Sequence, residues 1–287
     1  MNKSTSVTKI PNSELSILNK DILLKKLSLN GVILFEKGAK DVLEFAKFVR
    51  NNSSKLSMDP ARTIESGAAQ LVDAGTDAVG LHCENGNSPF WPDLCWFYCQ
   101  EAPPIGSQTT ICDGVAVYEQ LSSKAKTFFL EKDICYSRNV PEEKWKKLVC
   151  HYIPELNDIN SATFEHLNEI VSETENIKLT LNEDNSIFYQ FTVSALQSSL
   201  VNNKLAFANS ILGPSFNYEK PRITIAGTEQ PIPSEILDEI SKITELNTIP
   251  IDWDDNDFVL IDNRRVMHGR YKIIDERRKI FNALSYV

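Results

Sequence analysis

Short apolar runs separated by turn residues are the feature that most restricts how this chain can fold. They are rich in valine, isoleucine, threonine or aromatic side chains, and Asn-Gly, proline or glycine residues interrupt the central ones. They lie at residues 31–35, 78–84, 93–99, 107–112, 177–182, 186–194, 258–261 and 279–287. Runs of this length and composition are typical of β-strands. The sequence therefore predicts a core built mainly from β-sheet.

Other segments predict helices around this core. Helix-forming residues, or apolar residues at helical spacing, occupy residues 13–27, 41–50, 113–132, 161–172 and 234–246. Residues 141–147 begin with proline and acids and end in lysines, which favours a short helix. We expect residues 1–12 to be mobile and residues 51–77 to be loop. No glycine-rich nucleotide fingerprint follows a strand, so we expect an α+β protein with a mainly β core rather than a doubly wound sheet.

Composition limits the class of partner. The chain has 287 residues, of which 42% are hydrophobic, and a net charge of −9. That length suits one domain spanning residues 1–287, and that charge disfavours nucleic acid and anionic membranes. Six cysteines, no secretory signal and no long apolar run predict a reduced, cytoplasmic protein without a membrane segment. A small-molecule partner is expected, and a homo-oligomer is compatible with the sequence.

The tripeptide His82-Cys83-Glu84 is the first motif that suggests chemistry. Positions i and i+2 of a strand point to the same face, so His82 and Glu84 would project together. An imidazole and a carboxylate side by side supply two of the three ligands of a 2-His-1-carboxylate iron site. Alone, the motif is weak, because the same residues also form surface pairs and structural hydrogen bonds.

A third ligand would have to come from a distant histidine. The chain contains four histidines, and His268 has the best context because it follows the buried run 258–261 and a turn at residues 262–263. A β-barrel brings strands so distant in sequence together. The remaining two, His151 and His166, are expected to be ordinary surface or core residues.

Iron of this type commonly uses 2-oxoglutarate as a cosubstrate, which needs an anchor for its far carboxylate. A buried arginine and a hydroxyl donor are suited to that task. Arg278 lies at the start of the last predicted strand, and Thr109 lies on another strand. Its neighbour Thr110 is an alternative for the hydroxyl.

Several matched pieces together resemble a known family. Besides His82-x-Glu84, they are Ala102-Pro-Pro-Ile-Gly106-Ser-Gln-Thr109, Asp113, Val117-Tyr118-x-x-Leu121, Trp253, Asn256-Asp257, Leu260-Ile-Asp-Asn263, His268-Gly-Arg270 and Arg277-Arg278. In this order and spacing the chain resembles the taurine dioxygenase / clavaminate synthase group of Fe(II)- and 2-oxoglutarate-dependent oxygenases. The resemblance is strong over about 78–122 and 250–284 and weak elsewhere.

The resemblance implies a fold, a set of cofactors and a reaction. The fold would be a double-stranded β-helix, or jelly roll, with residues at about 140–220 inserted as a lid. His82, Glu84 and His268 would hold Fe(II), while Thr109 and Arg278 would bind 2-oxoglutarate. With O₂, such an enzyme hydroxylates or desaturates a C–H bond of a small molecule and releases succinate and CO₂.

One departure from the family pattern concerns the substrate. Sulfonate-oxidising members carry a second arginine four residues after the cosubstrate arginine, where this chain has Asn282. Because Arg278, Ile280 and Asn282 share one strand face, Asn282 would still face the site, without a charge. This disfavours a sulfonate, and an acidic ligand at Glu84 disfavours halogenation. The resemblance implies as substrate an amino acid, its derivative or a natural-product intermediate.

Less specific predictions remain open beside this interpretation. Arg270, Asn85 and Gln70 are candidate substrate contacts, and Arg270 could equally be structural. A catalytically silent jelly-roll protein that only binds a ligand is the main alternative function, and a zinc hydrolase on the same ligands is another. Cysteines 83, 95, 99 and 112 could form a structural zinc site, although core packing is the better interpretation.

Overall fold

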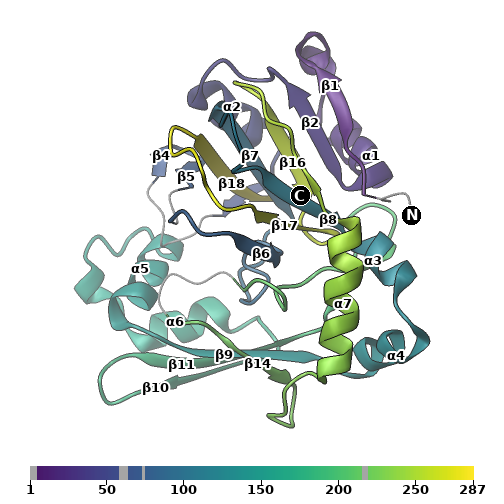
Figure 1. The fold of residues 1–287 in the computed structure, drawn as a ribbon. Coiled ribbons are helices and arrows are strands. Elements are labelled where there is room, and N and C mark those ends of the chain that lie inside the picture. Colours follow the sequence, from purple (N-terminus) through teal and green to yellow (C-terminus); the bar gives the residue numbers. More distant parts are fainter. Residues whose placement is uncertain (1–4, 58–63, 73–74, 215–218) are drawn as a thin grey trace.

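Two β-sheets that pack face to face form the centre of the molecule, and a third sheet lies beyond them (Figure 1). The structure is a computed structural model that describes residues 5–57, 64–72, 75–214 and 219–287. The two central sheets form the predicted double-stranded β-helix, with helices packed around it. The predicted fold class is therefore confirmed.

The larger central sheet has eight strands. Its order is β1-β2-β16-β7-β18-β5-β4, and β3 pairs with β18 off this path. The strands are β1 (Thr8–Pro11), β2 (Val32–Glu36), β3 (Lys55–Ser57), β4 (Ile64–Ser66), β5 (Ala69–Leu71), β7 (Leu94–Glu101), β16 (Phe258–Asp262) and β18 (Lys279–Tyr286). Only the β1–β2 pair among these is parallel.

Both faces of this sheet are buried, which explains its almost continuous apolar sequences. On the outer face, Trp96 and Tyr98 of β7 pack with helices α1 (Lys20–Asn30) and α2 (Val42–Asn51). On the inner face, Cys95, Phe97 and Cys99 of the same strand pack toward the second sheet. Successive side chains of β7 therefore point alternately into two different hydrophobic cores.

The smaller central sheet carries His82, Thr109, His268 and Arg270. Its order is β15-β8-β17-β6, and all its pairs are antiparallel. The strands are β6 (Val79–His82), β8 (Thr109–Asp113), β15 (Ile249–Pro250) and β17 (Val266–Arg270). Its outer face is covered by α3 (Gly114–Gln120) and α7 (Ser234–Asn247), which belong to the largest hydrophobic core.

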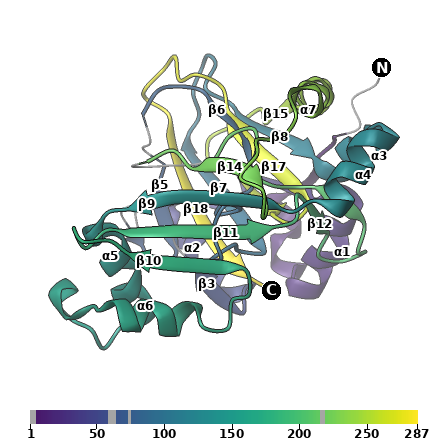
Figure 2. The ribbon, with the colours of Figure 1, turned by 90° about the horizontal axis from the view of Figure 1, so that it is seen from below.

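The third layer is a four-stranded sheet that Figure 2 shows from below, in the order β10-β11-β9-β14. Its strands are β9 (Ile134–Val140), β10 (Ile177–Leu181), β11 (Ile187–Val193) and β14 (Arg222–Ile225), and a separate pair consists of β12 (Leu196–Ser198) and β13 (Leu205–Phe207). Helices α4 (Ser123–Glu131), α5 (Glu142–Tyr152) and α6 (Phe164–Val171) also contribute to the largest core. That residues 140–220 act as a lid within a single domain stays a prediction.

Two segments differ from the sequence-based prediction. Both contain strands that are held by backbone hydrogen bonds to neighbouring strands, and their sequences show no regular spacing of apolar residues. The segment 1–12, expected to be mobile, contains β1, whose Ile10 is fully buried beside β2. The segment 51–77, expected to be loop, contains β3, β4 and β5. Residues 1–4, 58–63 and 73–74 of these segments lie outside the described residues.

Helix boundaries also differ from the prediction where capping residues intervene. The segment 113–132 is two helices, because Leu121 is extended and the Ser122 side chain caps α4. The segment 13–27 is a 3₁₀ helix at Asn12–Ile17 followed by α1, which Asn19 caps. The helix at 141–147 continues to Tyr152, and a short 3₁₀ helix at Ile159–Ser161 precedes α6. Among the described residues, six further strands lie outside the predicted elements, namely β9, β12, β13, β14, β15 and β17.

Within the described residues, every helix is too short or too polar to cross a bilayer.

Candidate metal centre

His82 and His268 lie opposite each other on adjacent strands. His82 ends β6 and His268 is the middle residue of β17, and the two are paired across the antiparallel ladder. Cross-strand partners project from the same face, and the two ring centroids are 4.4 Å apart. Both side chains are buried, with 4% and 3% of their surface exposed. The sheet register therefore brings together histidines that are far apart in sequence.

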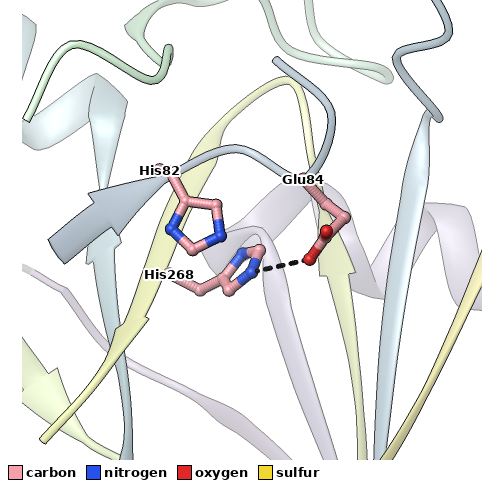
Figure 3. A group of neighbouring side chains, drawn as sticks. All are labelled: His82, Glu84 and His268. Atoms are coloured by element: carbon pink, nitrogen blue, oxygen red, sulfur yellow. Dashed lines mark ion pairs between the residues drawn. The ribbon is translucent and has the colours of Figure 1, made fainter. Parts of the chain in front are cut away.

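Glu84 completes the group from a turn rather than from a strand. The strand was predicted to continue to Glu84, but β6 ends at His82 and the chain turns at Glu84. One carboxylate oxygen, Oε2, lies 3.3 Å from Nε2 of His268 (Figure 3). Ligating atoms of the three side chains lie within 4.8 Å of one another. Among the described residues, this is the one cluster of histidine, cysteine or acidic side chains arranged to hold a metal ion.

The turn that carries Glu84 is held by Asn263, which lies between β16 and β17. The Glu84 backbone N–H donates to Asn263 Oδ1 at 2.9 Å, and Asn263 Nδ2 donates to the Glu84 carbonyl at 3.0 Å. The same Nδ2 donates to the Pro92 carbonyl at 2.9 Å. Asn263 is fully buried, so these bonds are shielded from water. The backbone of Glu84 is thus clamped from both sides.

The donor set fits a divalent iron ion. His82 Nδ1 lies 2.8 Å from the Gly80 carbonyl, which favours the tautomer that donates from Nδ1 and leaves the Nε2 lone pair for a metal. Two ligands bound about 2.1 Å from one ion at an angle of 90–110° lie roughly 3.0–3.4 Å apart, and the His268–Glu84 contact falls in that range at 3.3 Å. Two imidazoles and one carboxylate on one side leave the other positions open, as non-haem iron oxygenases require.

Thr109 lies on the same face of the smaller sheet as His268. The ladder pairs Thr109 with Arg270 and Ile111 with His268, so the odd residues of β8 face the interior. Thr110 pairs with Gly269 and faces the opposite side. Thr109 Oγ1 accepts a hydrogen bond from Trp253 Nε1 at 3.2 Å, which leaves the hydroxyl proton available for an acceptor. Of the two threonines considered, only Thr109 shares the face of the histidines.

Two guanidinium groups approach each other near this face. Arg278 precedes β18, and burial together with the positive charge of Arg270 lowers the pKa of Arg278 to about 10. Its Nε is buried and has no hydrogen-bond partner among the described residues. Arg270 donates through Nη2 to the carbonyls of Gly75 and Asp77, at 3.0 and 2.7 Å. Arg270 therefore has a structural role in holding the segment before β6, in addition to its charge.

The remaining predicted substrate contacts fall into two places. Asn282 on β18 pairs with Gln70 of β5 and with Phe97 of β7, so all three side chains share the inner face. Asn85 instead lies in the turn after Glu84, where its φ is +54° and its amide donates to the Phe90 carbonyl at 3.4 Å. The structure thus groups Asn282 with Gln70 and places Asn85 beside the metal ligands.

Among the described residues, the cysteines and the other two histidines are not members of the candidate ligand cluster. Cys95 and Cys99 belong to the core between the central sheets, whereas Cys83 and Cys112 belong to the largest core. His151 lies near the end of α5, and His166 accepts from the Thr163 backbone in a capping box. The four cysteines therefore pack in two separate cores, as the sequence favoured.

Sequence reasoning assigned no role to two neighbours of the group. Phe97 contacts the His268 ring at a centroid separation of 5.0 Å, and Asn263 clamps the Glu84 turn. Asn263 belongs to the matched motif Leu260-Ile-Asp-Asn263, which by itself predicts no contact with Glu84. A buried asparagine between two apolar strands is a signal that it makes specific hydrogen bonds.

A jelly roll that buries two histidines on adjacent strands and one carboxylate in the following turn defines a class of metal-dependent oxidising proteins. The chain belongs to the taurine catabolism dioxygenase TauD, TfdA family, which matches residues 7–284. Members of this family are oxygenases that use iron, 2-oxoglutarate and O₂.

Curated relatives are distant in sequence. The dapdiamide synthesis protein DdaC of Enterobacter agglomerans is 24% identical over 211 residues, which cover 69% of this chain and 63% of the relative. A clavaminate synthase-like protein of Arabidopsis thaliana is 23% identical over 224 residues, covering 72% and 64% respectively. The match thus spans less than two thirds of either relative's length.

Solved structures share the fold. PvcB, described as an Fe, alpha-ketoglutarate dependent oxygenase from an isonitrile synthetic pathway, aligns with a TM-score of 0.58 and 12% identity, over 98% of this chain and 82% of that one. AAD-2 in complex with Mn(II) and N-oxalylglycine aligns with a TM-score of 0.59 and 13% identity, over 99% and 95%. A taurine dioxygenase from Burkholderia xenovorans aligns with a TM-score of 0.60 and 11% identity, over 99% and 86%.

Proposed function

We propose that this protein is an Fe(II)- and 2-oxoglutarate-dependent dioxygenase that hydroxylates or desaturates a small molecule. The observation that carries the proposal is the buried group of His82, Glu84 and His268, whose ligating atoms lie within 4.8 Å of one another. The expected substrate is an amino acid, its derivative or a natural-product intermediate, and the expected products include succinate and CO₂. A cytoplasmic location and compatibility with a homo-oligomer stay predictions from the sequence.

The three clustered side chains would hold the iron. Bound iron supplies, together with 2-oxoglutarate, the activation of O₂ that oxidation of an unactivated C–H bond requires. His82 is oriented for this task by its contact with the Gly80 carbonyl, and Glu84 by the Asn263 clamp. The near-complete burial of all three residues limits access of water to the reacting centre.

The cosubstrate would be held through its far carboxylate. Although its pKa is lowered to about 10, Arg278 remains charged at neutral pH, and its buried Nε lacks a partner among the described residues. Arg270 adds a second positive charge, so a dianion would relieve repulsion between the two guanidiniums. The Thr109 hydroxyl, already accepting from Trp253, is set to donate to a carboxylate oxygen.

Anaerobic absorption spectroscopy tests the metal and cosubstrate roles. The full chain mixed with Fe(II) and 2-oxoglutarate is expected to give a weak visible charge-transfer band. His82→Ala removes one ligand and should abolish the band, whereas His151→Ala, a histidine outside the cluster, should retain it. Arg278→Met should weaken 2-oxoglutarate binding by at least about 30-fold, the equivalent of roughly 2 kcal/mol for a carboxylate left without its charge partner.

Succinate release tests the reaction itself. With Fe(II), ascorbate, 2-oxoglutarate and air, the wild type is expected to release succinate over a screen of amino acids and their derivatives. A protein that shows the band but releases no succinate, even uncoupled, would be a silent binding protein. Tightly held zinc with hydrolytic activity would indicate the hydrolase instead. Either result, or a band that persists in His82→Ala, would overturn the proposed function.

A further inference from the structure

Asn282 is an unusual residue because a polar amide side chain is fully buried in the middle of a strand. It lies in the middle of β18 with none of its surface exposed. Within the described part of the chain, neither Nδ2 nor Oδ1 has a hydrogen-bond partner. Buried amides in folded proteins almost always make hydrogen bonds, since an unsatisfied buried polar group destabilises the fold. A function outside the fold is therefore the better explanation for this asparagine.

The sheet register places Asn282 beside the candidate metal centre. It pairs with Phe97, whose ring contacts the His268 ring at a centroid distance of 5.0 Å. Cross-strand neighbours have Cβ atoms about 4.5–5.5 Å apart, so a single aromatic side chain separates Asn282 from His268. On its other side, Asn282 pairs with Gln70, which is 1% exposed. Its amide thus faces the interior between the two central sheets.

The two orphaned atoms specify what a ligand must offer. Nδ2 needs an acceptor and Oδ1 needs a donor. A carboxylate or sulfonate offers acceptors only, and an ammonium offers donors only, so either would leave one atom of Asn282 unsatisfied. An amide carries an acceptor and a donor at the spacing of the asparagine amide itself. It alone among these groups satisfies both atoms through a paired hydrogen bond.

The charges around Asn282 point to the same class of ligand. The nearest guanidinium on its strand face belongs to Arg278, four residues away and about 13 Å along the strand. The positive charges of Arg278 and Arg270 act on each other, so these two side chains form a positively charged region. The proposed function assigns this region to 2-oxoglutarate. An anionic substrate group at Asn282 would be buried with no cationic side chain adjacent on its strand face, which is costly. A neutral amide avoids that cost.

We propose that Asn282 is a specificity residue that recognises an amide group of the substrate through paired hydrogen bonds. The substrate class is then a small molecule bearing a carboxamide or a peptide-type amide. The identity of the ligand as the substrate rests on the proposed function. The claim that Asn282 binds a ligand, rather than stabilising the fold, does not depend on it. Two experiments separate these parts.

Thermal unfolding tests whether Asn282 serves the fold. Asn282→Leu replaces the orphaned amide with an apolar group of similar size, so the melting temperature should rise by about 2–4 °C if roughly 1 kcal/mol is recovered. The matched control is Asn263→Leu, a fully buried asparagine whose amide is bonded, and its melting temperature should fall. A fall for Asn282→Leu would mean that its amide stabilises the fold, and would overturn the proposal.

Matched probe pairs test the recognition. L-Asparagine, L-glutamine, L-leucinamide and L-phenylalaninamide are compared with L-aspartate, L-glutamate, L-leucine and L-phenylalanine, in succinate release by the wild type. At least one amide is expected to stimulate release about tenfold more than its acid, a difference of about 1.4 kcal/mol. Asn282→Leu should lose that preference, and Asn282→Arg should shift it toward the acid.

The remaining outcomes are decisive as well. If no amide exceeds its acid while the wild type still shows the Fe(II)–2-oxoglutarate band and uncoupled succinate, the amide proposal fails and the proposed function stands. If the band and succinate are both absent, the proposed function fails. If Asn282→Leu weakens 2-oxoglutarate binding by more than about tenfold, Asn282 contacts the cosubstrate and the amide proposal is overturned.

Discussion

Replacing Asn263 should destabilise the protein and weaken its metal centre together. The side chain accepts from the Glu84 N–H and donates to the Glu84 and Pro92 carbonyls, at 2.9, 3.0 and 2.9 Å. Asn263→Ala leaves one buried donor and two buried acceptors without these partners. At about 1–1.5 kcal/mol for each bond, the loss in free energy of unfolding should be roughly 3–5 kcal/mol. The Glu84 turn would also lose its orientation.

Urea unfolding and Fe(II) titration measure the two effects. Asn263→Ala should lower the midpoint of unfolding and weaken Fe(II) binding by about 10–100-fold, as outer partners of metal ligands typically do. The control is Asn168→Ala, an exposed position in α6 where alanine favours the helix. A loss below about 1 kcal/mol with unchanged Fe(II) binding would show that the clamp neither stabilises the turn nor positions Glu84.

Two further predictions concern pH and close packing. Burial raises the pKa of Asp262 to about 6, so the folded state keeps a proton that the unfolded state releases, and stability falls as pH rises from about 4 to 6. Between pH 4 and 7, the free energy of unfolding of the wild type, measured in urea, should fall by about 2–3 kcal/mol more than that of Asp262→Asn. If the free energies of the two proteins change in parallel with pH, this prediction is wrong. Separately, a Cβ on Gly213 would lie 2.5 Å from the Gly80 Cα. Gly213→Ala should therefore displace β6, which lowers the melting temperature and weakens Fe(II) binding at His82. An unchanged Fe(II) affinity would contradict this prediction.

The central strands could be predicted because their own residues dictate them. The run 258–261 is apolar throughout and lies in β16, which is buried on both faces. The run 93–99 alternates between two cores and forms β7. Residue type, spacing and sequence context also indicate His82, Glu84 and His268 as candidate metal ligands. In these cases local composition and tertiary environment agree.

Other features depend on contacts that a local pattern does not contain. Strand β9 includes Arg138 on its buried side, where Tyr189 Oη accepts a hydrogen bond from Nε at 3.1 Å, and an internal arginine obscures the strand signal. Strand β1 is ordered by its parallel pairing with β2. The end of β6 at His82 coincides with the Glu84 turn, which Asn263 holds from 179 residues away. A local period cannot reveal a partner at that distance.

The buried polar groups around the site divide into two kinds with opposite consequences. Asn263 and Arg265 are bonded within the protein, since the Arg265 guanidinium contacts the Asp113 carboxylate at 2.7 and 2.9 Å. Asn282 and the Nε of Arg278 have no hydrogen-bond partner in the part of the chain that the structure describes. Removing a bonded group leaves its partners unsatisfied, so stability and binding should fall together. Removing an orphaned group relieves its burial, so stability should rise while ligand binding falls. A substitution that raises stability but weakens ligand binding therefore identifies a residue that serves the ligand. A substitution that lowers both identifies a residue that serves the fold.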